Sequence, residues 1–124
     1  MAKTRPPIAL IAALLLAFAA LAAPTAARAG GFFSNIEDLP VMPGLAELPG
    51  SAVAFDKPAG RIAEVAASGR VSPDAVLAFY LRTLPQLGWR AAGPRRFARE
   101  DERLMLDFAR KGGQLTVRFS LSPG

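Results

Sequence analysis

The chain contains no cysteine and no histidine among its 124 residues. Without cysteine it can form no disulfide, thiolate metal site, thiol nucleophile or lipidated N-terminal cysteine. Without histidine it lacks the usual general base and the commonest transition-metal ligand. The two absences leave few residue types for catalysis, and the length leaves room for one domain at most.

The first 29 residues have the three-part pattern of a secretory signal peptide. Lys3 and Arg5 precede an uncharged run of 16 residues, 8–23, which is dominated by Ala, Leu and Ile. Small residues then lead to an expected cleavage between Ala29 and Gly30. The run is shorter than the roughly 20 residues that span a bilayer, so we expect cleavage rather than a retained anchor. The sequence thus predicts a periplasmic or secreted protein.

Charge is distributed unevenly along the rest of the chain. Loss of Lys3, Arg5 and Arg28 with the signal segment leaves 12 of the 15 basic residues against 10 acidic ones. Residues 30–56 carry four acidic residues and no basic one, whereas residues 57–124 carry all 12 basic residues and six acidic ones. An acidic arm therefore precedes a basic domain, and opposite charge can draw the two together.

Residues 30–50 form this arm, in which proline and glycine are too frequent for a helix or a regular strand. The arm is also rich in large apolar residues, which a solvated linker seldom contains. We expect part of the arm to lie along the domain and cover its core. In the alternative interpretation, Phe32-Phe33 or Val41-Met42 docks on a membrane or a partner.

The domain itself is expected over residues 51–124, starting with two short strands at 51–55 and 61–67 and a turn at 56–60. A helix is predicted over Pro73–Leu84, because apolar residues recur there with a helical period. Ser72 is its expected N-cap and Gly88 its left-handed C-terminal cap. Pro85 removes one backbone hydrogen bond and should tighten the last turn.

After the helix the apolar pattern changes to period two, which predicts a meander of antiparallel strands. Short strands are expected at 89–92 and 96–99, followed by a hairpin with a two-residue loop at Gly112-Gly113. Residue numbers across that hairpin then sum to 225, which places Asp107 opposite Arg118 and the large apolar residues on the other side. A turn at Glu100-Asp101 likewise places Phe97 opposite Leu104.

These elements predict a two-layer α+β fold in which one amphipathic helix packs on an antiparallel sheet. The expected order is β-β-α followed by three or four further strands. Phe79, Tyr80 and Trp89 are interpreted as core aromatics, because they lie on the face that the helix must bury. The Tyr80 hydroxyl and the Trp89 N–H then need hydrogen-bond partners or a place at the rim of the core.

The run VLAFYLRTLPQLGW, residues 76–89, is the most individual part of the chain. Together with FDKPAGRI before it and LMLDF and LTVRFSLSP after it, the run resembles small exported bacterial proteins of uncharacterised function, over residues 40–123. The resemblance implies a βαββ-type envelope protein, and it brings no catalytic residues to this chain.

The sequence offers little for catalysis. No Gly-x-Ser-x-Gly or Ser-x-x-Lys pattern occurs, and Ser72 already has a structural role as a helix cap. The acidic cluster Glu100-Asp101-Glu102 falls in a turn and is interpreted as solvated, since it lacks the spacing of a calcium loop. Gly112-Gly113 has neither the lysine nor the following helix of a phosphate loop. No cofactor, metal site or small-molecule substrate is indicated, and we expect the protein not to be an enzyme.

Basic residues concentrate in the predicted meander, and Arg96, Arg103, Met105 and Arg118 should share its outer side. We expect these four residues to form a contact surface. The expected function is that of a non-enzymatic interaction or assembly module whose partner is another envelope protein. The alternative is peripheral binding to an anionic membrane or lipopolysaccharide surface. The arginines can also serve only to keep the sheet soluble. An exported protein seldom meets nucleic acid, so no nucleic-acid partner is expected.

Overall fold

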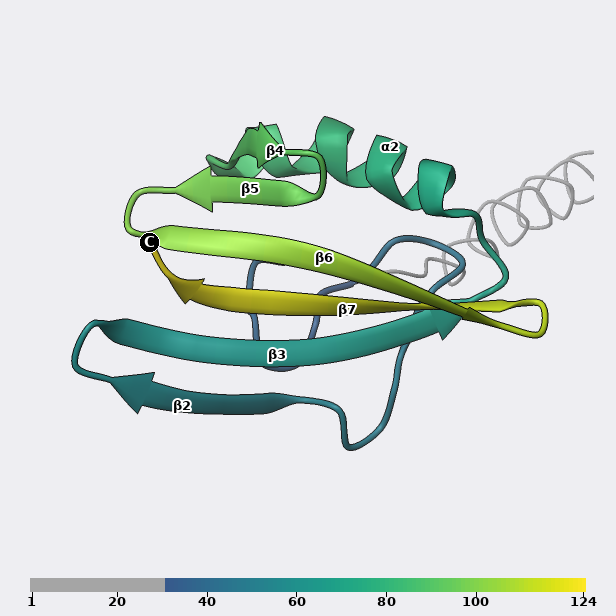
Figure 1. Ribbon diagram of the computed structural model, residues 1–124, viewed down its shortest axis with the longest axis horizontal. Helices are drawn as coiled ribbons and strands as arrows, with labels where there is room; N and C mark the ends of the chain where they lie inside the picture. The colour runs from purple at the N-terminus through teal and green to yellow at the C-terminus, as the bar shows by residue number, and fades with distance from the viewer. Residues whose placement is uncertain (1–30) are drawn as a thin grey trace, which may run out of the picture.

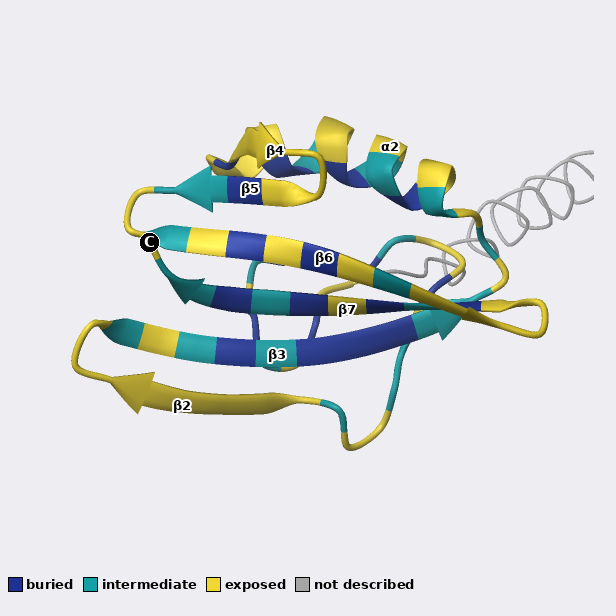
Figure 2. Ribbon diagram, in the orientation of Figure 1, coloured by how far each residue is buried: buried dark blue, intermediate teal, exposed yellow. Residues whose placement is uncertain are grey.

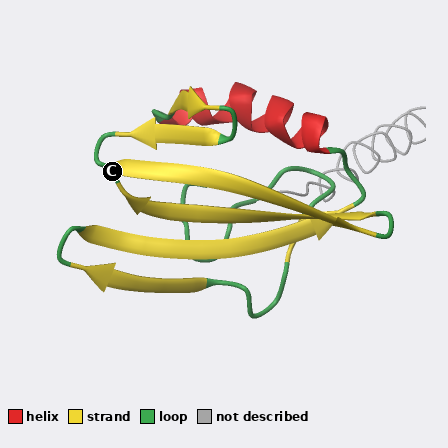
Figure 3. Ribbon diagram, viewed as in Figure 1, coloured by secondary structure: helices red, strands yellow, loops and turns green. Residues whose placement is uncertain are grey.

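The computed structural model of the protein describes residues 31–124, which form one α-helix and one seven-stranded antiparallel sheet (Figure 3). In chain order the elements are β1 (Ala46–Glu47), β2 (Val53–Lys57), β3 (Gly60–Gly69), α2 (Pro73–Thr83), a 3-10 turn η2 (Leu84–Leu87), β4 (Arg90–Gly93), β5 (Arg96–Arg99), β6 (Glu102–Lys111) and β7 (Gln114–Pro123). The predicted α+β class is confirmed. The expected cleavage site, Ala29 and Gly30, lies outside the described residues.

The sheet follows the order β1-β3-β7-β6-β5-β4, and β2 pairs with a second stretch of β3 (Figure 1). Its long central strands, β3, β7 and β6, are joined by antiparallel ladders, and every residue of β6 pairs with a residue of β7. The two-residue strand β1 was not expected from the sequence, because its partners Ala67 and Ser68 lie about twenty residues further along the chain.

The predicted register of the last hairpin is confirmed. Lys111 pairs with Gln114, which leaves Gly112-Gly113 as the two-residue loop, and Asp107 pairs with Arg118. Gly112 has a φ of 61°, the left-handed value that a tight hairpin turn requires at its first central position. Phe97 pairs with Leu104 as expected, around a turn at Glu100-Asp101.

The first hairpin differs from the prediction in its bounds. Strand β2 runs from Val53 to Lys57, so Asp56 and Lys57 are strand residues and not part of the turn. Lys57 pairs directly with Gly60, which leaves only Pro58 and Ala59 in the loop. The expected loop was too long because Asp56 and Lys57, which precede Pro58, were counted with the turn. In the structure they pair with Arg61 and Gly60, so β2 continues to Lys57.

The helix begins and ends as its capping residues predict. The Ser72 hydroxyl accepts a hydrogen bond from the Ala75 N–H at 3.0 Å, which satisfies one of the free N–H groups of the first turn. Pro85 ends the regular α-helix, and the last turn tightens into the 3-10 geometry of η2. Gly88 then takes a φ of 94° and closes the turn as a left-handed cap.

The arm packs into the same hydrophobic core as the domain. Phe33, Ile36 and Leu39 are each at most 3% exposed and belong to the core cluster, and in Figure 1 the arm runs behind the sheet. Val41 is also buried, whereas Phe32 is 60% exposed. The core therefore extends beyond the boundary expected at Ser51.

A buried hydroxyl connects the arm to the helix. Tyr80 is fully buried, and its hydroxyl donates to the Pro40 carbonyl at 2.7 Å and accepts from the Met42 N–H at 3.3 Å. These are the partners that a buried tyrosine needs. Tyr80 and Trp89 are both core residues, and Phe79 packs against the core, so the interpretation of the three aromatics is confirmed.

The sheet has two unlike faces. Side chains such as Val65, Leu106 and Phe119 are fully buried under α2 and the arm on what we call the inner face. We call the opposite side the outer face; no described segment lies across it over β5, β6 and β7 in the view of Figure 1. Along β6 and β7 buried and more exposed residues alternate (Figure 2), as expected for strands that are covered on one side.

Candidate interaction surface

The four residues predicted as a contact surface lie together on the outer face. Arg96 pairs with Met105, and Met105 pairs with Ser120. Arg103 is two residues from Met105 on β6, and Arg118 is two residues from Ser120 on β7. Because side chains two apart on a strand point to the same side, the register brings all four to one surface.

Three of these residues also line one groove on the outer face. Arg96, Arg103 and Met105 contribute to its wall, together with Arg90 from β4 and Ser120 and Ser122 from β7. The groove has a volume of about 560 Å³, which lies within the usual size range of ligand pockets. Its lining, drawn entirely from β4 to β7, includes three arginines and no carboxylate.

The groove arginines have no ion-pair partner in the described part of the chain. Among residues 31–124, the ion pairs involve only Arg99 and Arg118 on the basic side. Arg90, Arg96 and Arg103 form none, although all three lie in adjacent strands. Three like charges at one place favour the binding of an anion from outside.

Arg118 lies outside the groove and has a partner of its own. Its guanidinium Nη1 is 3.9 Å from Glu64 Oε1 of the neighbouring strand β3. Asp107 is directly across from Arg118 in the register, but the ion pair that the structure contains is the one with Glu64. Both side chains of that pair are about half exposed, so the pair contributes little to stability.

An apolar area occupies the other end of the outer face. Val53 is 51% exposed and pairs with Glu64, and Phe55 is 50% exposed and pairs with Ile62. The Lys57 Nζ lies 6.0 Å from the centre of the Phe55 ring. The outer face thus changes from basic over β4 to β6, through the serines of β7, to apolar over β2.

Arg90, Ser120 and Ser122 were not among the residues predicted for this surface. The two serines could have been recognised, because the period-two pattern of β7 places them on the same side as Arg118. Arg90 could not be recognised, because the register between β4 and β5 shifts between Ala91 and Gly93. The shift decides which side of the sheet Arg90 faces, and such a bulge leaves no clear sequence signal.

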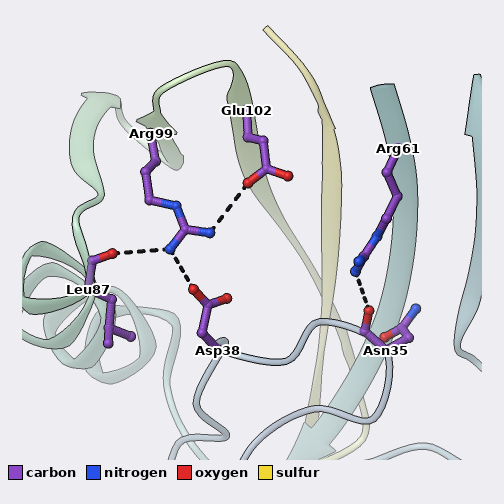
Figure 4. Close-up of polar contacts among 6 residues, drawn as sticks. All are labelled: Asn35, Asp38, Arg61, Leu87, Arg99 and Glu102. Atoms are coloured by element: carbon purple, nitrogen blue, oxygen red, sulfur yellow. Dashed lines mark hydrogen bonds and ion pairs between the residues drawn. The ribbon is translucent and has the colours of Figure 1, made fainter. Parts of the chain in front are cut away.

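A second polar cluster, around Arg99, joins three separate parts of the chain (Figure 4). The guanidinium lies 2.5 Å from Asp38 Oδ2 of the arm and 3.3 Å from Glu102 Oε1 of β6, and it donates to the Leu87 carbonyl at 3.1 Å. It also stacks 4.3 Å from the centre of the Trp89 ring. The contact with Asp38 is one instance of the expected attraction between the acidic arm and the basic domain.

The surroundings of Arg99 keep it charged. Its side chain is 23% exposed. Burial alone lowers the pKa of the Arg99 guanidinium, but the hydrogen bonds and charges of Asp38 and Glu102 outweigh burial, so the pKa lies above its ordinary value. The Arg99 guanidinium is engaged by Asp38, Glu102 and the Leu87 carbonyl. We therefore assign Arg99 a structural role.

A similar contact holds the start of the arm. The Asn35 side-chain amide donates to the carbonyl oxygens of Val53 at 3.1 Å and of Glu64 at 2.9 Å. The Arg61 guanidinium donates to the Asn35 carbonyl at 2.5 Å, as Figure 4 shows. Arg61 and Arg99 therefore fix the arm, whereas the groove arginines on the other face do not.

Residues 31–124 contain no group of three or more acidic side chains placed to hold a metal ion. Within the same residues, no helix is long and apolar enough to cross a membrane.

Burial raises the pKa of the Tyr80 hydroxyl above its ordinary value, with a smaller opposing effect of the Met42 N–H. A hydroxyl that is neutral, fully buried and already hydrogen-bonded on both sides is a structural group.

Comparisons of the chain with protein-family models, with curated proteins and with solved structures found no match.

Proposed function

We propose that the protein is a non-enzymatic interaction module of the cell envelope that binds an acidic partner protein through its outer face. The observation that carries the proposal is the set of three arginines in one open groove, none of which is paired within residues 31–124. The other side of the same sheet is covered by α2 and the arm. The proposed surface is therefore the side on which a partner has access to the strands.

The sheet is well suited to such a role. The proposed contact residues project from paired strands and not from loops, so little conformational freedom is lost on binding. Arginine offers a planar fork of donors that matches a carboxylate with two parallel hydrogen bonds. Met105, which is 38% exposed, adds a flexible apolar contact at the centre of the surface.

The binding proposal is tested with a matched pair of triple variants. Arg96→Ser, Arg103→Ser and Arg118→Ser together remove three charges from the outer face. Arg70→Ser, Arg82→Ser and Arg110→Ser together remove three exposed charges from elsewhere. With labelled poly-glutamate as the acidic probe, we expect the first variant to bind about tenfold or more weakly and the second to bind like the unaltered protein.

Equal weakening in both variants would contradict a defined surface and would indicate attraction by net charge alone. Circular dichroism and a denaturation midpoint keep the test independent of folding. Exposed arginines contribute little to stability, so both variants should unfold within about 0.5 kcal/mol of the unaltered protein.

Placement in the envelope depends on the signal segment. Mass spectrometry of the secreted or periplasmic protein is expected to give a chain that begins at Gly30. An intact N-terminus in the membrane fraction would contradict export as a soluble protein.

A second candidate function is binding to an anionic membrane surface. The observation in its favour is that Val53 and Phe55 are half exposed on the same face as the groove arginines, so apolar and basic groups are presented together. In flotation with vesicles of anionic lipid, salt-sensitive binding that the Phe55→Ser variant loses would support this function. Binding to poly-glutamate that is unchanged in Phe55→Ser supports the protein partner instead.

A further inference from the structure

We propose that Arg90, Arg96 and Arg103 form a receptor for a single phosphate monoester group, seated over Ala98 in the outer-face groove. This inference goes beyond the acidic-partner proposal, because it concerns one compact dianion and does not depend on the ligand being a protein. It rests on the register of three strands and on the groups that line the groove.

The three arginines surround one small residue. Ala98 of β5 pairs with Arg90 of β4 on one side and with Arg103 of β6 on the other. Neighbouring strands are about 4.8 Å apart, so the backbones of the two arginines are roughly 10 Å apart with Ala98 between them. Arg96 lies two residues from Ala98 on the same strand, roughly 7 Å away and on the same side. All four residues line the groove.

Two of the arginine side chains lie close to glycines. The aliphatic part of Arg96 lies over Gly93, where a Cβ would come within 3.4–3.7 Å of three of its side-chain carbons. Gly93 follows the register shift in β4 and pairs directly with Arg96. The Arg103 side chain lies in the same way beside Gly124.

The chemistry of the lining favours a phosphate monoester over other anions. The three guanidinium groups only donate hydrogen bonds, and the hydroxyls of Ser120 and Ser122 add donors beside them. A phosphate monoester has three terminal oxygens and a charge of about −1.5 to −2 at pH 7, so it can engage all three arginines. A carboxylate or a phosphate diester carries one negative charge and two free oxygens, so its attraction to the three guanidinium groups is weaker than that of the dianion. Met105 offers an apolar wall for the organic part of the ligand.

Calorimetry with three soluble probes tests the selectivity. Phenyl phosphate is the monoester, diphenyl phosphate the diester and benzoate the carboxylate. We expect the diester and the carboxylate to bind at least about tenfold more weakly than the monoester, because each carries less negative charge to the three arginines. Equal affinity for the three probes, or no binding of the monoester, would overturn the proposal.

Two variants test the geometry without changing the net charge. Arg90→Lys keeps the charge and loses the fork, and Ala98→Leu fills the seat between the arginines. Both are expected to weaken phenyl phosphate binding by about tenfold or more. Arg110→Ser, which removes an exposed charge from β6 outside the groove, should leave it unchanged. If Arg110→Ser weakened binding as much as Arg90→Lys, diffuse charge would explain the binding and the proposed position over Ala98 would be wrong.

The source of the phosphate group is decided by a separate arm of the experiment. Vesicles with phosphatidic acid present a monoester on a lipid, and vesicles with phosphatidylglycerol present a diester. Selective binding to the first that is lost in Ala98→Leu assigns a lipid headgroup; binding of phenyl phosphate without binding to these vesicles assigns a soluble ligand. If Ala98→Leu loses phenyl phosphate binding but keeps poly-glutamate binding, the phosphate site is separate from the surface proposed for the acidic partner.

Discussion

At the scale of single residues, the protein separates its polar groups by role. Arg99 contacts Asp38, Glu102 and the Leu87 carbonyl, and its hydrogen bonds connect segments that are far apart in the sequence. Arg90, Arg96 and Arg103 have no ion-pair partner within residues 31–124. The same residue type therefore stabilises the fold at one place and remains available to a ligand at another.

Ser72 makes a hydrogen bond whose loss can be measured. In the Ser72→Ala variant the Ala75 N–H loses the acceptor that lies at 3.0 Å, and we expect the free energy of unfolding to fall by about 1 kcal/mol. Chemical denaturation with an unchanged slope measures this difference. An unchanged midpoint would contradict the cap.

Tyr80 makes two contacts with the arm through one hydroxyl. Tyr80→Phe leaves the Pro40 carbonyl and the Met42 N–H without this partner, and we expect it to cost about 1–3 kcal/mol. Hydrogen exchange of the Met42 amide should also become faster. A variant as stable as the unaltered protein would show that water replaces the hydroxyl at no cost.

The ionisation of Tyr80 gives a prediction with a definite sign. Burial raises the pKa of this hydroxyl above its ordinary value of 10.0, so the unfolded chain releases the proton at a lower pH than the folded one does. The contribution to stability is present below pH 10 and is lost as the pH rises above it. Because the chain has a single tyrosine, the ultraviolet absorbance of tyrosinate should appear only as the protein unfolds. Tyrosinate in a folded protein near pH 10 would contradict the burial.

At the scale of elements, close approach of the arm to β3 depends on a glycine. A Cβ at Gly69 would collide with the carbonyl oxygen of Gly44, which is backbone and cannot rotate away. We expect Gly69→Ala to destabilise the protein by about 1–3 kcal/mol, as measured by thermal unfolding. Gly113→Ala is the control, because the nearest atom to its Cβ is the mobile end of Arg70 at 3.0 Å. Similar losses of stability in both variants would contradict the close approach of Gly44 to Gly69.

Local patterns predicted the elements that depend on neighbouring residues. The alternation in Leu104, Leu106 and Phe108 and the tight Gly112-Gly113 loop are enough to determine the register of the last hairpin, because a slip by one residue would bury Arg118. Likewise Ser72 and Pro85 predicted where the helix starts and where it tightens. In each of these cases the deciding interactions lie within a few residues.

The sequence did not predict features that depend on distant segments. Strand β1 exists because Ala46 and Glu47 meet Ser68 and Ala67, and two residues carry no period that could reveal them. The Arg99 cluster combines Asp38 of the arm, the Leu87 carbonyl of η2 and Glu102 of β6. None of these segments alone indicates in the sequence that they meet. Of the residues that line the groove, Arg96, Arg103 and Met105 were predicted as contact residues. Arg90 was not predicted, because a bulge places it there.

At the scale of the whole molecule, the arm completes the core. A chain that begins at Ser51 lacks the buried side chains of Phe33, Ile36 and Leu39 and both partners of the Tyr80 hydroxyl. We expect such a chain to show no near-ultraviolet circular dichroism and no cooperative unfolding, whereas residues 31–124 show both. Cooperative unfolding of the shorter chain at an unaltered midpoint would contradict a shared core.

We propose that the outer face binds an acidic partner, whereas the inner face maintains the fold. Nuclear magnetic resonance of the isotope-labelled protein, titrated with poly-glutamate, locates the binding surface, because each backbone amide reports its own position. We expect the largest shifts on outer-face positions of β5 to β7, around Arg96, Arg103 and Ser120. Shifts confined to α2 and the arm, or spread evenly over all basic residues, would contradict it.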